Sequence, residues 1–143
     1  MIRSLTLVIA LLATQAAAES IVICAPQTWP ADATSLDEAY AAHSLIFVAN
    51  VSTIVDAVST EVSWSYQLLP PALKGDVPAE GTLNVDMVSC NKPHLAIEAT
   101  MVIFLDELDE VARADNTVAV VYGDGNVIEQ WIVEWVAEKL DGR

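Results

Sequence analysis

Residues 61–69 alternate between apolar and polar side chains as far as Leu68, and this period of two predicts a β-strand with one buried face. The apolar members are Val62, Trp64, Tyr66 and Leu68, and the polar members are Glu61, Ser63, Ser65 and Gln67. Pro70 and Pro71 follow, and because proline has no amide hydrogen to donate, strand pairing must stop or bulge there. This segment is the clearest strand in the chain and favours a mainly β fold.

Four further segments have strand patterns. Residues 43–51 form a nearly continuous apolar run, which is typical of a strand buried on both faces. Residues 82–88 alternate, with Leu83, Val85 and Met87 on one face. Residues 99–105 and 117–122 are short apolar runs, and the second ends in the turn signal Gly123-Asp124-Gly125.

Two segments carry helix signals. Ser35 followed by Glu38 is a capping-box pattern and predicts a short helix over residues 36–42. A similar start at Asn126 predicts a second helix over about residues 127–140. Its apolar side chains form one stripe, made of Ile128, Trp131, Ile132, Trp135, Val136 and Leu140. The opposite face is acidic, whereas membrane-surface helices are usually basic, so we expect the stripe to dock on the protein's own core.

The order of elements is therefore a short helix, five strands and an amphipathic helix, which predicts one domain over residues 19–143. Five short strands are compatible with a small closed or nearly closed barrel flanked by the helices, because closure removes exposed strand edges.

Residues 1–18 have the pattern of a cleaved signal peptide. Arg3 precedes an apolar stretch over residues 5–13, and Ala16-Ala17-Ala18 form a small-residue cleavage site before Glu19. The stretch is shorter than the roughly 20 residues that span a bilayer, which disfavours a signal anchor. Ile23 before Cys24 disfavours lipid attachment. We expect export to the periplasm or the medium, with no membrane insertion after cleavage.

The expected mature chain is strongly acidic. Loss of Arg3 leaves 5 basic residues against 20 acidic ones, a net charge of −15. This charge repels phosphate backbones and anionic lipids, so nucleic-acid binding is excluded. Solubility is the simpler reason for such a charge, and attraction to cations or to a basic protein is the functional one.

Cys24 and Cys90 are the two cysteines of the chain. An even count in an exported protein predicts one disulfide. The bond would close a loop of about 67 residues, worth about 4 kcal/mol in the chain-entropy model. Neither a C-x-x-C motif nor a metal-ligand spacing is present, so redox and metal roles are disfavoured.

Catalytic signals are weak. His43 and His94 lie in unrelated local settings, and no nucleophile elbow, zinc-binding motif, phosphate loop or dinucleotide fingerprint accompanies them. A small hydrolase using either histidine is the least favoured interpretation. The acidic run 106–110 lacks the glycine of a calcium loop, and Asp124 lies between two glycines. We expect a solvated loop and a turn there, with no catalytic residues, metal or cofactor.

The four tryptophans could form a carbohydrate platform, but core packing explains most of them. Trp64 lies on the apolar face of a strand, and Trp131 and Trp135 lie on the apolar helix stripe. Trp29, in a proline-flanked segment, is the one expected to be exposed.

Several short segments, in order, resemble the netrin-like domain found in tissue inhibitors of metalloproteinases and their bacterial relatives. The resemblance covers about residues 24–122. It is carried by Cys24-Ala25-Pro26, the helix from Leu36 to Ala42, the strand from His43 to Val51, Leu73-Lys74-Gly75, Val85 to Cys90 and Met101 to Leu105.

The resemblance implies an oligonucleotide-binding-type (OB-type) five-stranded barrel with flanking helices. It also implies a secreted, non-enzymatic domain that binds a protein, with a zinc metalloprotease as the partner class. By this resemblance, Cys90 pairs with the segment around Cys24. The implied partner-binding residues are Cys24, Ala25, Pro26, Trp29, Ser89, Asn91 and His94.

The chain departs from the family at the inhibitory motif. The inhibitors begin at C-x-C, and the terminal cysteine chelates the protease zinc through its free amine and carbonyl. Cleavage before Glu19 leaves Cys24 internal, and Pro26 stands where the second cysteine would be. The alternative is a structural or envelope-associated domain of the same fold without inhibitor activity.

Overall fold

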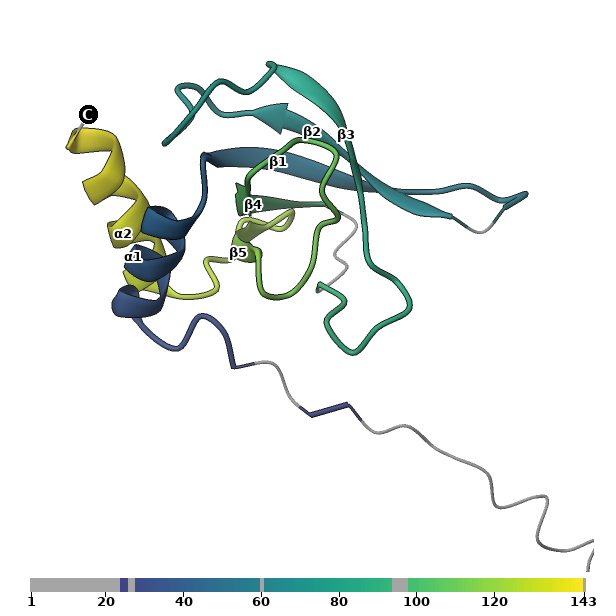
Figure 1. Cartoon of the computed structure of the whole chain (residues 1–143), viewed down its shortest axis with the longest axis horizontal. Helices are drawn as coiled ribbons and strands as arrows, with labels where there is room; N and C mark the ends of the chain where they lie inside the picture. Colours follow the sequence, from purple (N-terminus) through teal and green to yellow (C-terminus); the bar gives the residue numbers. More distant parts are fainter. Residues whose placement is uncertain (1–23, 26–27, 60, 94–97, 143) are drawn as a thin grey trace, which may run out of the picture.

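The computed structural model describes residues 24–25, 28–59, 61–93 and 98–142. Two helices and five strands occur in this part of the chain (Figure 1). In order they are α1 (Ala33–Ala42), β1 (Leu45–Val55), β2 (Val62–Leu68), β3 (Glu80–Asn84), β4 (Glu98–Leu105), β5 (Thr117–Tyr122) and α2 (Gln130–Asp141). The expected signal peptide, residues 1–18, lies outside the described residues. Within the described ranges, no helix has the length and apolar character needed to cross a membrane.

The five strands form one antiparallel sheet in the order β3-β2-β1-β4-β5. The mainly β prediction is confirmed, but the sheet is open and is not a closed barrel. The chain just after β3 and the loop before β5 meet at one isolated parallel bridge, between Val85 and Ala112. There the Ala112 amide donates to the Asn84 carbonyl at 2.8 Å, and the Asp86 amide donates to the Ala112 carbonyl at 3.0 Å.

The predicted strand over 82–88 is wrong at its C-terminal end, because β3 ends at Asn84. Val85 is still buried, but Met87 is exposed. The chain turns at Asp86, whose carboxylate accepts hydrogen bonds from the amides of Val88 and Ser89. This local turn competes with strand pairing, so β3 ends there and is not paired with β5.

One face of the sheet carries the larger apolar cluster. The alternation over β2 is confirmed, since Trp64 and Tyr66 are both buried in this cluster. Its buried members are Phe47, Ala49, Val51, Trp64, Tyr66, Ala72, Leu83, Val85, Ala99, Met101, Ile103, Leu105 and Ala112. The Trp64 Nε1 atom is buried with no hydrogen-bond partner among the described residues.

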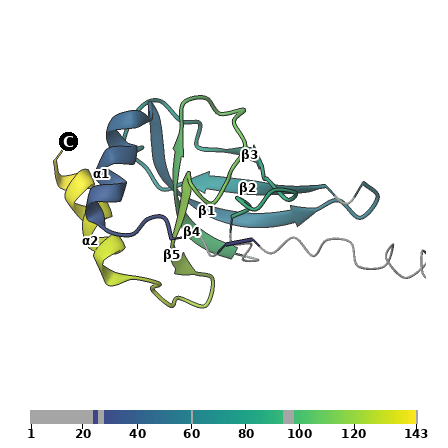
Figure 2. The ribbon, with the colours of Figure 1, turned by 60° about the horizontal axis from the view of Figure 1, so that its bottom comes forward.

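The other face of the sheet packs against the two helices, which lie together at one end of the molecule (Figures 1 and 2). This second cluster buries Leu36, Ile46, Val48, Leu73, Val102, Phe104, Val118, Val120, Ile132 and Trp135. β1 contributes to both clusters through successive residues, so the prediction of a strand buried on both faces is confirmed.

Helix α1 begins earlier than predicted. Asp32, not Ser35, is the N-cap, and its Oδ1 accepts hydrogen bonds from the Ser35 amide at 2.9 Å and the Ser35 hydroxyl at 3.1 Å. The capping-box prediction is therefore wrong in register: the carboxylate upstream supplies the acceptor that the first turn needs.

Helix α2 begins later than predicted, at Gln130. Asn126 does not cap it; the Asn126 amide and side chain bond to Asp124 in the turn. The chain then runs back along β5, with the Tyr122 amide donating to the Asn126 carbonyl and the Ile128 amide donating to the Val120 carbonyl. Of the predicted apolar stripe, Ile132 and Trp135 are buried, while Ile128 and Leu140 are exposed at the two ends.

Leu73-Lys74-Gly75 joins the helices to the sheet. Lys74 exchanges two backbone hydrogen bonds with Ile46, at 2.9 and 3.0 Å. Its ammonium group donates to the Tyr40 carbonyl in the last turn of α1 at 2.8 Å. Gly75 has a φ of +77°, and a Cβ there would lie 2.5 Å from the Ser44 carbonyl oxygen. The motif thus anchors the α1–β1 junction.

Candidate functional site

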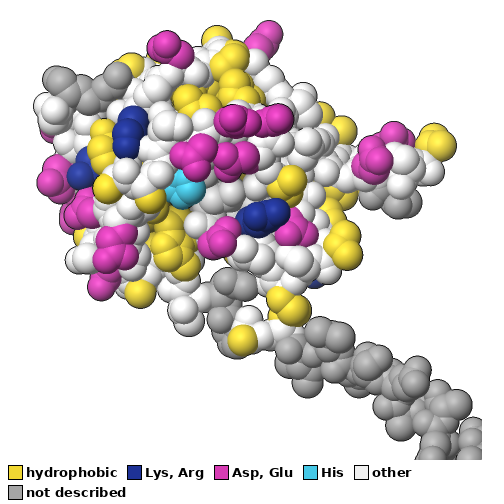
Figure 3. Space-filling view, in the orientation of Figure 1, with side chains coloured by type: hydrophobic (Ala, Val, Ile, Leu, Met, Phe, Trp, Pro, Cys, Tyr) yellow, Lys and Arg dark blue, Asp and Glu magenta, His cyan; other side chains and the backbone are white. Residues whose placement is uncertain are grey.

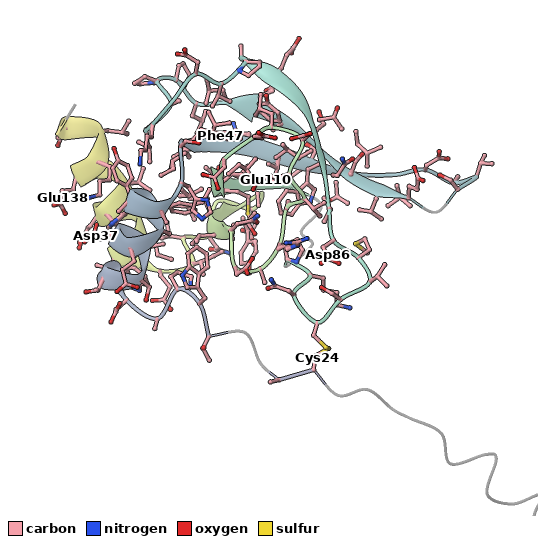
Figure 4. The ribbon with its side chains drawn as sticks, viewed as in Figure 1. Cys24, Asp37, Phe47, Asp86, Glu110 and Glu138 are labelled. Atoms are coloured by element: carbon pink, nitrogen blue, oxygen red, sulfur yellow. A yellow bond between two sulfur atoms is a disulfide. The ribbon has the colours of Figure 1, made fainter. Side chains whose placement is uncertain are left out.

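A disulfide joins Cys24 to Cys90, with 5.3 Å between the two Cα atoms, and confirms the predicted pairing (Figure 4). It ties the N-terminal segment to the loop between β3 and β4. Cys24, Ala25, Ser89 and Cys90 are all exposed. We call Cys24, Ala25, Ser89, Cys90 and Asn91 the disulfide ridge.

Asp86 organises the loop side of the disulfide ridge. Its carboxylate accepts from the Ser89 hydroxyl at 2.6 Å, the Ser89 amide at 3.0 Å and the Val88 amide at 3.1 Å. Arg113 Nε lies 3.6 Å from the same carboxylate. The Ser89 bonds, followed by the Val88 bond and the nearby guanidinium, hold the pKa of Asp86 below its usual range. These contacts stabilise the ionised form of the carboxyl.

The remaining contacts of the loop fasten it to the body of the domain. The Asn91 amide donates to the Ser89 hydroxyl at 3.0 Å, and the Ala114 amide donates to the Asn91 carbonyl at 2.8 Å. The disulfide then links this loop to Cys24. The loop side of the ridge therefore has a braced backbone, and the N-terminal side is tied to it by one covalent bond.

The structure brings together four of the seven predicted partner-binding residues: Cys24, Ala25, Ser89 and Asn91. Trp29 differs from expectation because it is half-buried. Its ring packs edge-to-face on Phe104 with 5.8 Å between centroids, so it belongs to the helix-side cluster. Trp29 also lines a cavity of 610 Å³ together with Lys92 and Trp131. Pro26 and His94 lie outside the described residues.

His43 lies at the α1–β1 junction, as expected. Its Nδ1 is buried 3.5 Å from Asp106 Oδ2, a separation that forms no hydrogen bond. Ser44 also contacts Asp106, but its hydroxyl donates to the carbonyl of Asp106 at 3.1 Å and to the carboxylate at 3.4 Å. The serine proton is therefore directed to Asp106 and not to the imidazole. This arrangement differs from a nucleophile–base–carboxylate relay, in which the base contacts the nucleophile.

The acidic run 106–110 forms the start of the loop between β4 and β5, as predicted. The Glu110 carboxylate turns back and accepts the amides of Asp106 at 3.0 Å and Glu107 at 3.1 Å. Among the residues that the structure describes, no three His, Cys, Asp or Glu side chains lie close enough to hold a metal ion.

A second exposed feature, which we did not predict from the sequence, lies beside the disulfide ridge. A groove of 750 Å³ separates the β1–β2 hairpin from the chain that follows β3, and Val111 and Arg113 complete its wall. Its two sides carry the same tetrapeptide pattern, Asp-x-Val-Ser, at residues 56–59 and 86–89. This repeated pattern is the signal in the sequence that could have identified the groove.

Comparison with known proteins adds no relative: no family model, no curated protein and no solved structure matches the chain.

Proposed function

We propose that this protein is an exported, non-enzymatic domain that binds another protein through the disulfide ridge. The observation that carries the proposal is the Cys24–Cys90 bond, which fastens an exposed N-terminal segment to an exposed loop. A braced surface loses little conformational freedom on binding, so more of its contact energy appears as affinity. A disulfide is also compatible with an oxidising compartment outside the cytoplasm.

A zinc metalloprotease is the partner class that the netrin-like resemblance indicates. The sheet order and the parallel approach of Val85 to Ala112 support an OB-type barrel, a five-stranded architecture that is partly open. In such a fold, the disulfide ridge would present the N-terminal segment and the adjoining loop as one contact surface.

A second candidate is an envelope-associated domain of the same fold without inhibitor activity. Pro26 in place of a second cysteine favours it. With Glu19 as the first residue, the nitrogen of Cys24 is a peptide amide, which is a poor zinc ligand because metal ligands must offer a free lone pair. Any inhibition of a protease would then have to come from surface contacts of the disulfide ridge and not from chelation of the protease zinc by Cys24.

The test uses the oxidised, exported protein, after N-terminal sequencing establishes whether it begins at Glu19. It is assayed against a panel of zinc metalloproteases and used as bait under native conditions. Ala25→Arg places a bulky cation on the ridge and is expected to abolish capture and inhibition. Ala137→Arg, at an exposed alanine of α2, is the matched control and is expected to behave as wild type.

The two candidates give different results. Inhibition that Ala25→Arg removes supports the ridge as an inhibitory surface. Association with the cell envelope, without inhibition of any protease in the panel, supports the second candidate. Capture of no partner and no envelope association would contradict both.

A further inference from the structure

The two Asp-x-Val-Ser segments form turns of the same design. In the first, the Asp56 carboxylate accepts the amides of Val58 at 2.8 Å and Ser59 at 3.4 Å. In the second, the Asp86 carboxylate accepts the amides of Val88 and Ser89. In both turns, these hydrogen bonds from the backbone to the aspartate fix a conformation in which the valine side chain points to solvent.

The outward valines are almost completely exposed. Val58 is 95% exposed and Val88 is 98% exposed. Leaving a valine in water forgoes the stabilisation that burial of its side chain would give. Two such residues at matching positions of two matching turns have no role in the protein's own core.

The two turns lie on opposite sides of the 750 Å³ groove. The groove is lined by apolar side chains from three segments, among them Val62, Val85 and Val111. Ile54 and Met87, which are both partly exposed, continue the apolar surface toward the turns. Val88 also lines the groove, and Val58 lies in the turn between the lining residues Asp56 and Ser59. Apolar side chains therefore lie in and beside the groove of a protein that is otherwise strongly acidic.

The rim of the groove has the charge needed to select a partner. Three carboxylates line it, from Asp56, Glu61 and Asp86, against one cation, Arg113, which is already beside Asp86. Figure 3 shows acidic and apolar side chains together on the projecting hairpin. An apolar surface with an acidic rim is complementary to an aliphatic segment flanked by basic residues.

We propose that this groove binds a segment of a partner protein in which aliphatic side chains alternate with or adjoin lysine or arginine. The inference deepens the proposed function, because it rests on the domain being a protein-binding module and names the chemistry of the partner. A second copy of the chain is disfavoured as the occupant, since each copy carries a net charge of −14 or more negative.

The experiment is an NMR titration of the isotope-labelled, oxidised protein with a short soluble peptide that carries valines flanked by lysines. We expect amide shifts confined to the groove, at residues 54–59, 61–63, 84–88 and 111–113. Control peptides with glutamate in place of lysine, or serine in place of valine, are expected to bind at least about tenfold more weakly. Added salt is expected to weaken binding of the lysine peptide.

Substitutions in the protein locate the surface. Val58→Ser and Val88→Ser remove apolar area without disturbing a buried contact, and each is expected to weaken peptide binding about tenfold. Leu140→Ser is the matched control, because Leu140 is also an exposed apolar residue but lies near the end of α2. It should leave binding unchanged.

Other outcomes would overturn the inference. Shifts elsewhere on the protein, equal binding of the glutamate peptide, or unchanged binding by both valine variants would each do so. A dimer in sedimentation experiments that Val58→Ser dissociates would assign the groove to a second copy. Binding to phosphatidylcholine vesicles that Val58→Ser abolishes would assign it to a membrane.

This result is separable from the test of the disulfide ridge. Ala25→Arg is expected to leave peptide binding intact. If the peptide binds in the groove while the ridge captures no partner, only the role of the ridge is contradicted. If the ridge captures a partner but the peptide does not bind, only the inference about the groove fails.

Discussion

The indole Nε1–H of Trp135 donates a 2.9 Å hydrogen bond to Oδ1 of Asp37 and ties α2 to α1. Lys139 Nζ lies 3.0 Å from the same oxygen. Trp135 is buried and its ring packs on Phe104 and Tyr40. The bond therefore connects the two helices at the point where they cover the sheet.

Asp37→Ala is expected to lower the free energy of unfolding by about 1–2 kcal/mol, because it leaves a buried indole donor without its acceptor. The lost contact with Lys139 adds little, since the aspartate is half exposed and solvent screens the pair. Urea denaturation followed by tryptophan fluorescence measures the change. Glu38→Ala, at the neighbouring exposed position, is the control and should stay within about 0.5 kcal/mol of wild type. Equal stability of both variants would contradict the role of this bond.

Acid is expected to destabilise the fold through Asp37 and Asp86. Hydrogen bonds from Trp135 and Lys139 lower the pKa of Asp37, and those from Ser89 and Val88 lower the pKa of Asp86. A carboxyl whose folded pKa lies below its unfolded value stabilises the fold fully above that unfolded value, about 3.9 for aspartate. The contribution is then lost as the pH falls through the lower, folded pKa.

Denaturation midpoints measured from neutral pH down through this acid range test the prediction. The free energy of unfolding of Asp86→Asn should fall less steeply with decreasing pH than that of wild type, because one titrating carboxyl group has been removed. An acid dependence identical to that of wild type would mean that the Asp86 turn does not stabilise the folded state.

Side-chain periodicity predicted the sheet because burial determines where strands can lie. β2 and β5 match the predicted residues closely, and β1 is buried on both faces as its apolar run indicated. The helix starts were harder to predict, because several polar side chains near each start can serve as the cap. Asp32 takes the role expected of Ser35, and Asn126 bonds to Asp124 instead of opening α2.

The candidate surfaces were predictable only in part. The count of cysteines indicated the Cys24–Cys90 bond, and with it the disulfide ridge. The groove depends on two turns that are distant in sequence, and a valine in a β-rich chain is usually a core residue. Only the arrangement of the hairpin opposite the end of β3 shows that Val58 and Val88 face solvent.

Removal of the disulfide is expected to destabilise the protein without dismantling the sheet. The Cys24→Ser/Cys90→Ser double variant should lose about 2–4 kcal/mol, because an unbridged unfolded chain has more conformational freedom. Reduction of the wild-type protein should give the same loss, and far-ultraviolet circular dichroism should keep its β signature in both. Two free thiols in the unreduced protein, found by mass spectrometry, would contradict the bond.

Gly75 and Gly125 form a matched pair for testing how the Leu73-Lys74-Gly75 motif anchors the fold. Both have positive φ, +77° and +85°, so alanine at either position costs about 1–2 kcal/mol in backbone strain. A Cβ at Gly75 would also lie 2.5 Å from the Ser44 carbonyl oxygen, whereas nothing lies within 4 Å of a Cβ at Gly125. The backbone at Ser44 cannot move freely, because the neighbouring Ile46 is paired with Lys74.

The free energy of unfolding of Gly75→Ala is therefore expected to be at least about 2 kcal/mol lower than that of Gly125→Ala, a difference as large as many single substitutions cause in total. Chemical denaturation of the two purified variants gives the difference directly. Since the strain from positive φ is common to both, the difference isolates the close contact between Gly75 and the α1–β1 junction. Equal losses would mean that the junction relaxes around the added methyl group and that the motif does not hold it rigidly.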